Sequence, residues 1–427
     1  MKRIDLTITA QAPLAIGQRK PGGSVSEAMD YIPGSVIRGA IAGKLLQHGT
    51  PETGDDFHRL FIEEEAAIFQ NAYPAIAKLG EDNYTVSPGE IRVLPATALS
   101  SKTDSGFKKS PNDGRSGVFD SLIDSYCARE HGLFYEPNDL KGDRVEPFGG
   151  FYSYYEDDET QRDKPWTRYV SHSVSKRLLT RVGINRRRAT AQDEILYSLE
   201  VLNETQGKAK RQSTVYRSSI LVNDDNLAEE LCAFIGQERD RFRLGGAASR
   251  GLGKVEVSVK LEDVADSTTN VERRIYQFNH RLKDDRWQQW SQFASGASSI
   301  ADKTFFSISL ESDAILTENW RRTFVLSAEI LSRLAELPES KVTLEMAYSS
   351  YDYRSGWNAA WGLPKDVELI TKMGSVFLFN IPEVEQDNWI KKLANLESQG
   401  VGDRTSEGFG QIKVCDEFHR IMREEPV

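Results

Sequence analysis

The sequence contains few cysteines and histidines. Its 427 residues include three cysteines, at Cys127, Cys232 and Cys415, and six histidines. Three scattered cysteines form neither a disulfide framework nor a zinc-binding pattern, so each is interpreted as a small buried hydrophobe. The histidines show no HExxH or other metal-binding spacing. The composition therefore predicts neither a metal ion nor another cofactor.

Long apolar runs are also missing. No segment approaches the ~20 apolar residues that cross a bilayer as a helix. Residues 1–8 alternate like a strand and lack the apolar core of a signal peptide. With 39% hydrophobic and 28% charged residues, the composition is that of an ordinary globular protein, and the length fits two or three domains. We expect a cytoplasmic protein without membrane contact.

Positive charge is scarce overall but concentrated in one segment. The formal net charge is −10, which argues mildly against nucleic-acid binding by the whole surface. Residues 176–217 nevertheless contain ten basic and four acidic residues, a local charge of +6. Within them, the pattern of 180–202 predicts a β-hairpin arm with a basic tip. The tip residues Arg186, Arg187 and Arg188 either are merely solvated or contact RNA phosphates.

Two glycine-rich loops, each followed by a strand pattern, lie within 244–259 and 399–414. Six positions of the two loops coincide at one fixed offset, among them the pairs Ser249/Ser406, Gly251/Gly408 and Gly253/Gly410. Such glycines can simply make tight turns before core strands. They also reach positive φ and let backbone N–H groups converge on an anion. The repetition favours a duplicated module.

The first strand, predicted over residues 3–10, is followed by a loop and then by a helix within residues 31–46. Ser35 is placed as its N-cap, and the apolar residues that follow fall on one stripe. The N-terminal amides, together with Ser35 and Arg38, would suit a phosphate. A capped core helix fits the same residues equally well.

Two stretches of the first half resemble insertions. Residues 100–120 have the composition of a flexible loop. Aromatic residues crowd 134–166, where they either stack on unpaired bases or, more commonly, fill the core.

The second half follows a β-α-β-β-α-β order. Its expected elements are a strand at 305–310, a helix at 320–337, strands at 342–349 and 375–379, a helix at 384–396, and a strand after the second glycine loop. This order predicts an α+β fold of two ferredoxin-like, RRM-type modules. The first module would span 1–261 with insertions over about 100–215, a linker 262–274, and the second module 275–427.

Several motifs, taken together, resemble the RAMP superfamily of CRISPR-associated proteins. These are Pro13-Leu14-Ala15-Ile16-Gly17, Tyr31-Ile32-Pro33-Gly34-Ser35-x-x-Arg38-Gly39, Val182-Gly183-Ile184-Asn185-Arg186, Met373-Gly374-Ser375-Val376-Phe377 and both glycine loops. The paired modules are most similar to the handle-binding RAMP subunit of type III-D effector complexes. The resemblance implies an antiviral ribonucleoprotein, with guide RNA, target RNA, other RAMP subunits and the large polymerase-like subunit as partners. The arm is similar to the thumb of the backbone subunits, which lies across the guide–target duplex.

The residues expected to bind RNA lie in the first helix, the arm and the two glycine loops. They are Ser35, Arg38, Arg181, Arg186, Arg187, Arg188, Gly246, Ser249, Arg250, Gly251, Gly253, Arg404, Gly408 and Gly410.

Catalysis is the alternative. Target-cleaving backbone subunits of the family carry an acidic residue between the first strand and the first helix, and here Glu27 and Asp30 are the candidates. That reading would require a divalent ion such as Mg²⁺. A guide-processing RAMP ribonuclease would instead use a histidine as general acid or base, and His48 is the candidate. Since neither has a supporting second group in the sequence, a non-catalytic RNA-binding subunit is favoured over an endoribonuclease.

Overall fold

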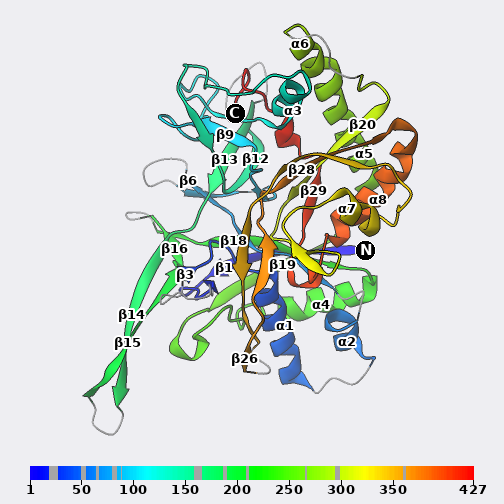
Figure 1. The fold of residues 1–427 in the computed structure, drawn as a ribbon. Helices are drawn as coiled ribbons and strands as arrows, with labels where there is room; N and C mark the ends of the chain where they lie inside the picture. The colour runs from blue at the N-terminus through cyan, green and yellow to red at the C-terminus, as the bar shows by residue number, and fades with distance from the viewer. Residues whose placement is uncertain are drawn as a thin grey trace.

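The computed structural model describes residues 1–18, 27–49, 54–63, 67–78, 84–87, 89–157, 166–185, 190–207, 211–264, 267–293, 299–358 and 362–427. The fold is α+β, as predicted, and most of its strands pair antiparallel (Figure 1). Among the described residues no helix has both the length and the apolar character needed to span a bilayer. Cys127 and Cys415 are buried and Cys232 is half-buried, and all three are free thiols.

The first sheet has β1 near its centre. Its strands, in order, are β19 (Val255–Asp263), β1 (Lys2–Ala10), β18 (Val215–Val222) and β4 (Ile68–Phe69), with β5 (Tyr73–Pro74) also paired to β18. The helix α1 (Gly34–His48) follows β1, and α4 (Asp225–Gln237) connects β18 to β19. Every second side chain of β1 from Ile4 onward is buried because one face of the sheet packs on the core shared with α1 and α4. This is the ferredoxin-like order.

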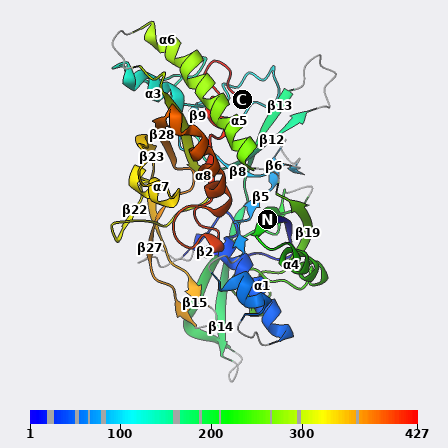
Figure 2. The same cartoon turned by 90° about the vertical axis from the view of Figure 1, so that its right-hand side faces the viewer.

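The second sheet repeats the plan. Its strands, in order, are β23 (Thr343–Tyr348), β28 (Val376–Pro382), β20 (Lys303–Leu310) and β29 (Ile412–Val414), and its helices are α7 (Ala328–Leu334) and α8 (Gln386–Gln399). Another helical stretch comprises α5 (Ser267–Asn279), the π-helix η2 (His280–Trp287) and α6 (Gln288–Ser291). The helix α5 packs beside α8 on β20 (Figure 2). The two sheets therefore have separate cores.

An insertion between β5 and β18 forms a third body. One sheet runs β7 (Tyr84–Val86), β6 (Ile76–Lys78), β13 (Trp166–His172), β12 (Phe151–Asp157) and β8 (Arg92–Val93). A second sheet has the strand order β10 (Val118–Asp120), β9 (Ala98–Ser101) and β11 (Val145–Pro147). The helix α3 (Leu122–Glu130) follows β10 in the chain. The apolar face of α3 joins the core of the second module, so the insertion ties the modules together.

The arm is a two-stranded hairpin that projects from the body (Figure 1). It consists of β14 (Lys176–Asn185) and β15 (Thr190–Leu202), paired antiparallel from Lys176 with Leu202 to Asn185 with Thr190. The predicted hairpin is therefore confirmed. Its expected tip residues Arg186, Arg187 and Arg188 lie outside the described residues.

The remaining elements are short. They are β2 (Gly17–Gln18), β3 (Glu27–Ala28), α2 (Asp56–Phe61), β16 (Thr205–Gln206), β17 (Gln212–Ser213), β21 (Leu316–Glu318), β22 (Arg321–Thr323), β24 (Tyr351–Arg354), β25 (Trp357–Asn358), β26 (Leu363–Pro364), β27 (Glu368–Thr371) and the 3₁₀ turns η1 (Ala248–Arg250), η3 (Glu383–Glu385), η4 (Thr405–Glu407) and η5 (Glu417–Arg420).

Some local predictions were wrong. Ser35 makes no capping hydrogen bond, because Pro33 occupies the N-cap position and Ser35 lies inside the helix. The helix expected over 320–337 is shortened to α7, because residues before it turn back as the β21–β22 hairpin. By contrast, Phe151 and Tyr152 of the aromatic stretch are buried in the core, which is the alternative that the sequence favoured. Residues 262–274 contain the end of β19 and over half of α5, and the division into two modules there stays a prediction.

Candidate nucleic-acid interface

The two glycine loops have the same backbone structure. Each donates backbone hydrogen bonds to the segment that follows the first strand of its own module. The equivalent pairs, N–H to carbonyl, are Gly246–Ala15 and Asp403–Ile315, both 2.9 Å, and Gly253–Pro13 and Gly410–Asp313, 2.9 and 2.8 Å. The repeat seen in the sequence is therefore a structural duplication.

Positive φ angles recur at the same positions of both loops. A 3₁₀ turn is flanked by left-handed residues on each side: Ala247 and Gly251 in the first loop (φ 57° and 85°), Arg404 and Gly408 in the second (φ 61° and 92°). Glycine reaches this region without strain, which explains why Gly251 and Gly408 match. The loops differ in what lies against them.

The second loop is pressed against the N-terminus of α1. A Cβ atom added at Gly408 would lie 2.8 Å from both Asn71 Oδ1 and the Phe69 carbonyl, and 3.2 Å from Gly34 Cα. Asn71 Oδ1 accepts the Gly34 N–H at 2.8 Å, so Asn71 supplies a cap from a distant part of the chain. The second loop and the start of α1 therefore form a contact between the modules.

The charges of Glu407, Arg404 and Lys365 at this contact are paired, whereas the buried Nε of Arg38 has no hydrogen-bond partner among the described residues. Glu407 accepts from Arg404 at 2.6 Å and from Lys365 at 2.8 Å. Burial opposes its ionisation, but these hydrogen bonds and charges lower the pKa of Glu407 to about 2. Arg38 donates to the Phe61 carbonyl and stacks over the Phe61 ring. Gly408 and Gly410 are buried, and Ser35, Arg38 and Arg404 are half-buried.

The first loop is open to solvent and adjoins the arm. Gly246, Ser249, Arg250 and Gly251 are exposed, and Gly253 is buried. Arg250 donates to the Tyr197 hydroxyl, and its guanidinium lies 5.2 Å from the centre of the Tyr197 ring. Because Tyr197 lies midway along β15, this contact joins the loop to the middle of the arm.

Arg181 extends this surface along the arm. It faces Tyr197 directly across the hairpin, so the two side chains lie on one face. Arg181 is exposed and has no hydrogen bond or ion pair within the part of the chain that the structure describes. Arg177 lies on the same face but is paired with Glu204 at 3.0 Å. We call Arg181, Tyr197, Arg250 and the first glycine loop the loop–arm surface.

The candidate catalytic residues are separated. Asp30 is 66% exposed and pairs with Lys176 at 2.8 Å, which ties it to the arm base. Glu27 is exposed on β3, and most of the loop before it, 19–26, lies outside the described residues. His48 ends α1 and faces Glu238 at 3.7 Å, about 20 Å along the helix from its start. No group of three or more His, Cys, Asp or Glu in the described ranges is placed to hold a metal ion.

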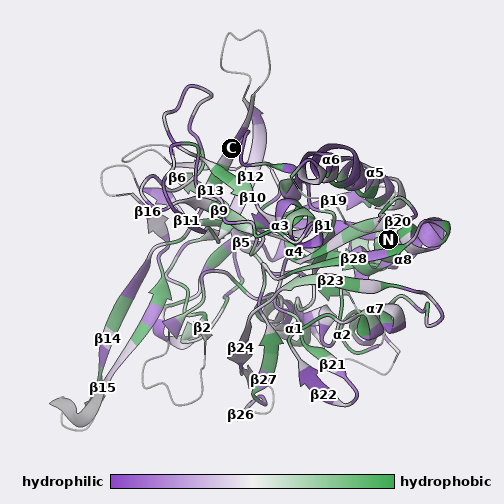
Figure 3. Ribbon diagram, turned by 45° about the horizontal axis from the view of Figure 1, so that its top comes forward, coloured by the Kyte–Doolittle hydropathy of each residue, from purple (hydrophilic) through white to green (hydrophobic). Residues whose placement is uncertain are grey.

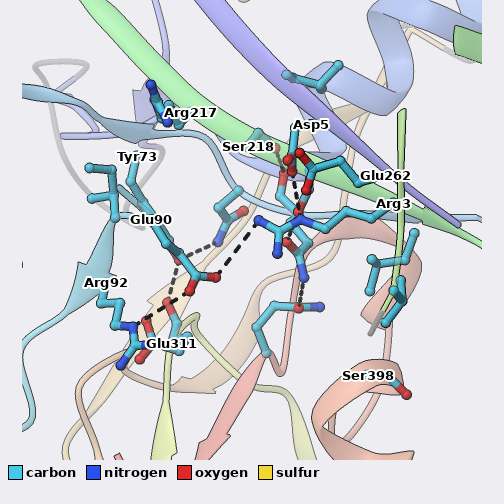
Figure 4. A pocket seen from close by; sticks show the side chains of 18 of the residues that line it. Arg3, Asp5, Tyr73, Glu90, Arg92, Arg217, Ser218, Glu262, Glu311 and Ser398 are labelled. Atoms are coloured by element: carbon cyan, nitrogen blue, oxygen red, sulfur yellow. Dashed lines mark hydrogen bonds and ion pairs between the residues drawn. The ribbon is translucent and has the colours of Figure 1, made fainter. Parts of the chain in front are cut away.

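A cleft of about 680 Å³ lies between the open face of the first sheet and the second module (Figure 4). Basic and acidic residues line it in equal number: Arg3, Arg92, Arg217, Lys260 and Lys413, and Asp5, Glu90, Glu262, Glu311 and Glu397. Burial raises the pKa of Glu311 to about 8, so this carboxyl is largely neutral near pH 7. Several of these pair with each other, as Arg3 does with Asp5 at 2.6 Å and Lys413 with Glu397 at 3.1 Å. Pairing within the cleft therefore neutralises much of its charge.

Sequence reasoning missed three residues that organise this region. Tyr197 gave no signal beyond its place in a strand. Tyr31, within a recognised motif, is buried between the modules and accepts from Arg354 at 2.8 Å, while Arg354 pairs with Asp313 at 2.5 Å. Tyr31 and Arg354 lie 323 residues apart, so no local pattern could have linked them.

Comparisons with known proteins give one family match. A family model described as the RAMP superfamily matches residues 7–256. No curated protein matches significantly. Among solved structures, the chain is similar to a chain of the type III-B Cmr-beta complex bound to cognate target RNA and AMPPnP, with 13% identity over 88% of this chain and 86% of that chain at a TM-score of 0.36. It is also similar to oligomeric Cmr4 from Pyrococcus furiosus, with 16% identity over 62% and 100% of the respective chains at a TM-score of 0.27.

Proposed function

The chain belongs to the RAMP superfamily, and on that premise we propose that it is an RNA-binding subunit of a type III CRISPR effector complex. In this role it grips the 5′ handle of the guide RNA and contacts neighbouring protein subunits. It does so without cleaving RNA.

The loop–arm surface carries the proposal. Arg250 and Arg181 lie beside one tyrosine ring and are both exposed, in a protein whose formal net charge is −10. Two guanidinium groups can each bind a phosphate. The N–H groups of Gly246, Arg250 and Gly251 already donate to carbonyls within the protein, so the two arginine side chains are the donors available to RNA. The tyrosine holds Arg250 in place, so less side-chain entropy is lost on binding.

The two glycine loops have different roles in this proposal. The first loop is free to meet the RNA backbone, whereas the second joins the modules at the start of α1. The handle would therefore cross the first module from its glycine loop toward the arm. Such binding is through phosphates, so it tolerates sequence changes and weakens with salt.

The test compares guide-RNA affinity of Arg181→Ala, Arg250→Ala and their double variant in the purified protein. If each arginine binds one phosphate, the double variant binds roughly 100-fold more weakly, because each charge-assisted bond contributes about 1.5 kcal/mol. The slope of log affinity against log salt falls by about 1.4 for two lost contacts with a single strand.

Arg273→Ala is the matched control. Arg273 is an exposed arginine on α5, on the far side of the molecule from the arm (Figure 1). An equal loss in this control, or unchanged affinity in the double variant, contradicts the proposal. Loss of target cleavage in an assembled complex carrying Asp30→Ala, with its guide still bound, would instead identify a nuclease.

A further inference from the structure

The hairpin β21–β22 holds an exposed tryptophan at its tip. Its strands pair from Leu316 with Thr323 to Glu318 with Arg321, which leaves Asn319 and Trp320 as a two-residue turn. The Trp320 side chain is fully exposed. Burying an indole is strongly favourable, so an indole held in water at a protruding tip is available to a partner.

The turn backbone is unsuited to tryptophan. Both turn residues have positive φ, 46° at Asn319 and 65° at Trp320. A two-residue turn of this kind prefers Asn-Gly, because glycine alone reaches the second position without strain. The chain has the expected asparagine but tryptophan in place of glycine. Trp320 has a strained backbone and an unburied side chain, so it does not stabilise the fold. This combination points to a role in binding a partner.

Side-chain hydrogen bonds and ion pairs hold the hairpin on the protein. Arg322 donates to Thr317 Oγ1 at 2.6 Å and to Glu368 at 3.0 Å, and it also pairs with Asp403. Arg333 donates to the Thr317 carbonyl at 2.7 Å. The tip is therefore presented in one orientation, which reduces the entropy lost when a partner binds.

Further exposed rings continue from the hairpin onto the neighbouring ribbon β24–β27. Phe324, just beyond β22, lies 5.3 Å from Tyr351, and Tyr351 lies 6.1 Å from Tyr353, measured between ring centres. All three rings are exposed. We call Trp320, Phe324, Tyr351 and Tyr353 the aromatic surface.

The charge around the aromatic surface favours protein over nucleic acid. Arg322 pairs with Glu368 and Asp403, and Arg321 lies opposite Glu318 across the hairpin, so these three carboxylates outnumber the two arginines. An RNA-binding surface needs a local surplus of positive charge, which is missing among these residues. Tryptophan, tyrosine and arginine are the residue types that dominate protein interfaces.

The aromatic surface is also distinct from the loop–arm surface. Figure 3 shows the β21–β22 hairpin and the arm on opposite sides of the β24–β27 ribbon, and Figure 2 shows the same separation. A partner on one surface leaves the other accessible.

We infer that the β21–β22 hairpin is a docking knob: Trp320 inserts into an apolar pocket of a neighbouring protein subunit, and a carboxylate at the pocket edge faces Arg321. The inference rests on the proposed function only in requiring that the chain belong to a multi-subunit assembly. It concerns a protein contact, whereas the loop–arm surface concerns RNA.

The first test is Trp320→Gly in the assembly co-expressed with its protein subunits and guide. This change creates the favoured Asn-Gly turn, so the hairpin is kept while the indole is lost. We expect native mass spectrometry to show at least a tenfold lower occupancy of one protein subunit, with guide RNA content unchanged. Phe134→Ala, which removes another exposed ring, should leave occupancy unchanged. Full occupancy in Trp320→Gly overturns the inference.

The second test places the photo-crosslinker p-benzoyl-phenylalanine at position 320 of the assembled complex. The expected product is a conjugate with another protein subunit that survives ribonuclease treatment. A ribonuclease-sensitive conjugate would identify RNA as the partner, and no conjugate would identify a free surface; either overturns the inference. Loss of guide RNA from the Arg181 and Arg250 variants would not change these results, so the two proposals fail separately.

Discussion

Replacing one glycine in each loop by alanine distinguishes the energetic cost of backbone strain from the cost of disturbing the contact between the modules. Gly251 and Gly408 occupy the same position of the duplicated loop, with φ of 85° and 92°. Alanine at either position adopts a left-handed conformation, which costs about 1–2 kcal/mol. A Cβ atom at Gly251 meets nothing within 4 Å, so that strain is the whole expected cost.

Gly408→Ala carries further costs. The new Cβ lies 2.8 Å from the Phe69 carbonyl, which is backbone and cannot rotate away. Moving the loop outward costs about 1–3 kcal/mol of repacking. Displacing Asn71 from the Gly34 N–H removes a further ~1 kcal/mol. We therefore expect a total of roughly 3–6 kcal/mol for Gly408→Ala, against about 1–2 kcal/mol for Gly251→Ala.

The assay is equilibrium urea unfolding of the wild type and both variants, followed by far-UV circular dichroism. The free energy of unfolding should fall distinctly more in Gly408→Ala than in Gly251→Ala. Equal losses would show that the second loop is as unconstrained as the first. That result would refute the assignment of the second loop to the contact between the modules.

Two further predictions concern buried charges. Burial, with a smaller contribution from Asp416, raises the pKa of Glu311 to about 8. This folded-state pKa exceeds the unfolded one, so the protonated Glu311 contributes its full share to the free energy of unfolding below about pH 4.5. That contribution is lost as pH rises through 8. Glu311→Gln stays neutral, so between pH 5 and 9 its free energy of unfolding should fall less than that of the wild type, by roughly 3–5 kcal/mol; parallel curves would contradict the assignment. Asp124 binds Arg286 at 2.7 Å and Trp290 Nε1 at 2.9 Å in the core between α3 and η2. Asp124→Ala should lower the free energy of unfolding in urea by about 3–5 kcal/mol because it leaves Arg286 buried without this partner. Asp285→Ala removes the partner of Arg281 in a more exposed ion pair and should lower it by less than about 1 kcal/mol. Similar losses in the two variants would contradict this expectation.

The parts of the fold that follow from local patterns could be predicted. The β-α-β-β-α-β order of the second half, the arm and the loop duplication all follow from periodicities and glycine spacing. The failures have distant causes. Ser35 has the right residue type for a cap, but Asn71 reaches Gly34 from another segment. The pattern of residues 320–337 predicts one helix, but it does not reveal that its first residues pair with β21 as the strand β22.

The candidate site shows a similar limit. The two glycine loops are nearly equivalent in sequence, and nothing local distinguishes the exposed loop from the buried one. The difference arises because the second module places its loop on α1 of the first, through Gly408 and Gly34. Tyr197 becomes part of the site only because the arm brings it beneath Arg250. Such contacts between modules cannot be read from one sequence.

We propose that the loop–arm surface holds the guide RNA. The most direct measurement is ultraviolet crosslinking of the bound guide in the purified complex, followed by identification of the crosslinked peptides by mass spectrometry. We expect crosslinks to peptides that contain Tyr197 and residues 244–253. Crosslinks confined to residues 399–410, with none to the first loop or the arm, would contradict it.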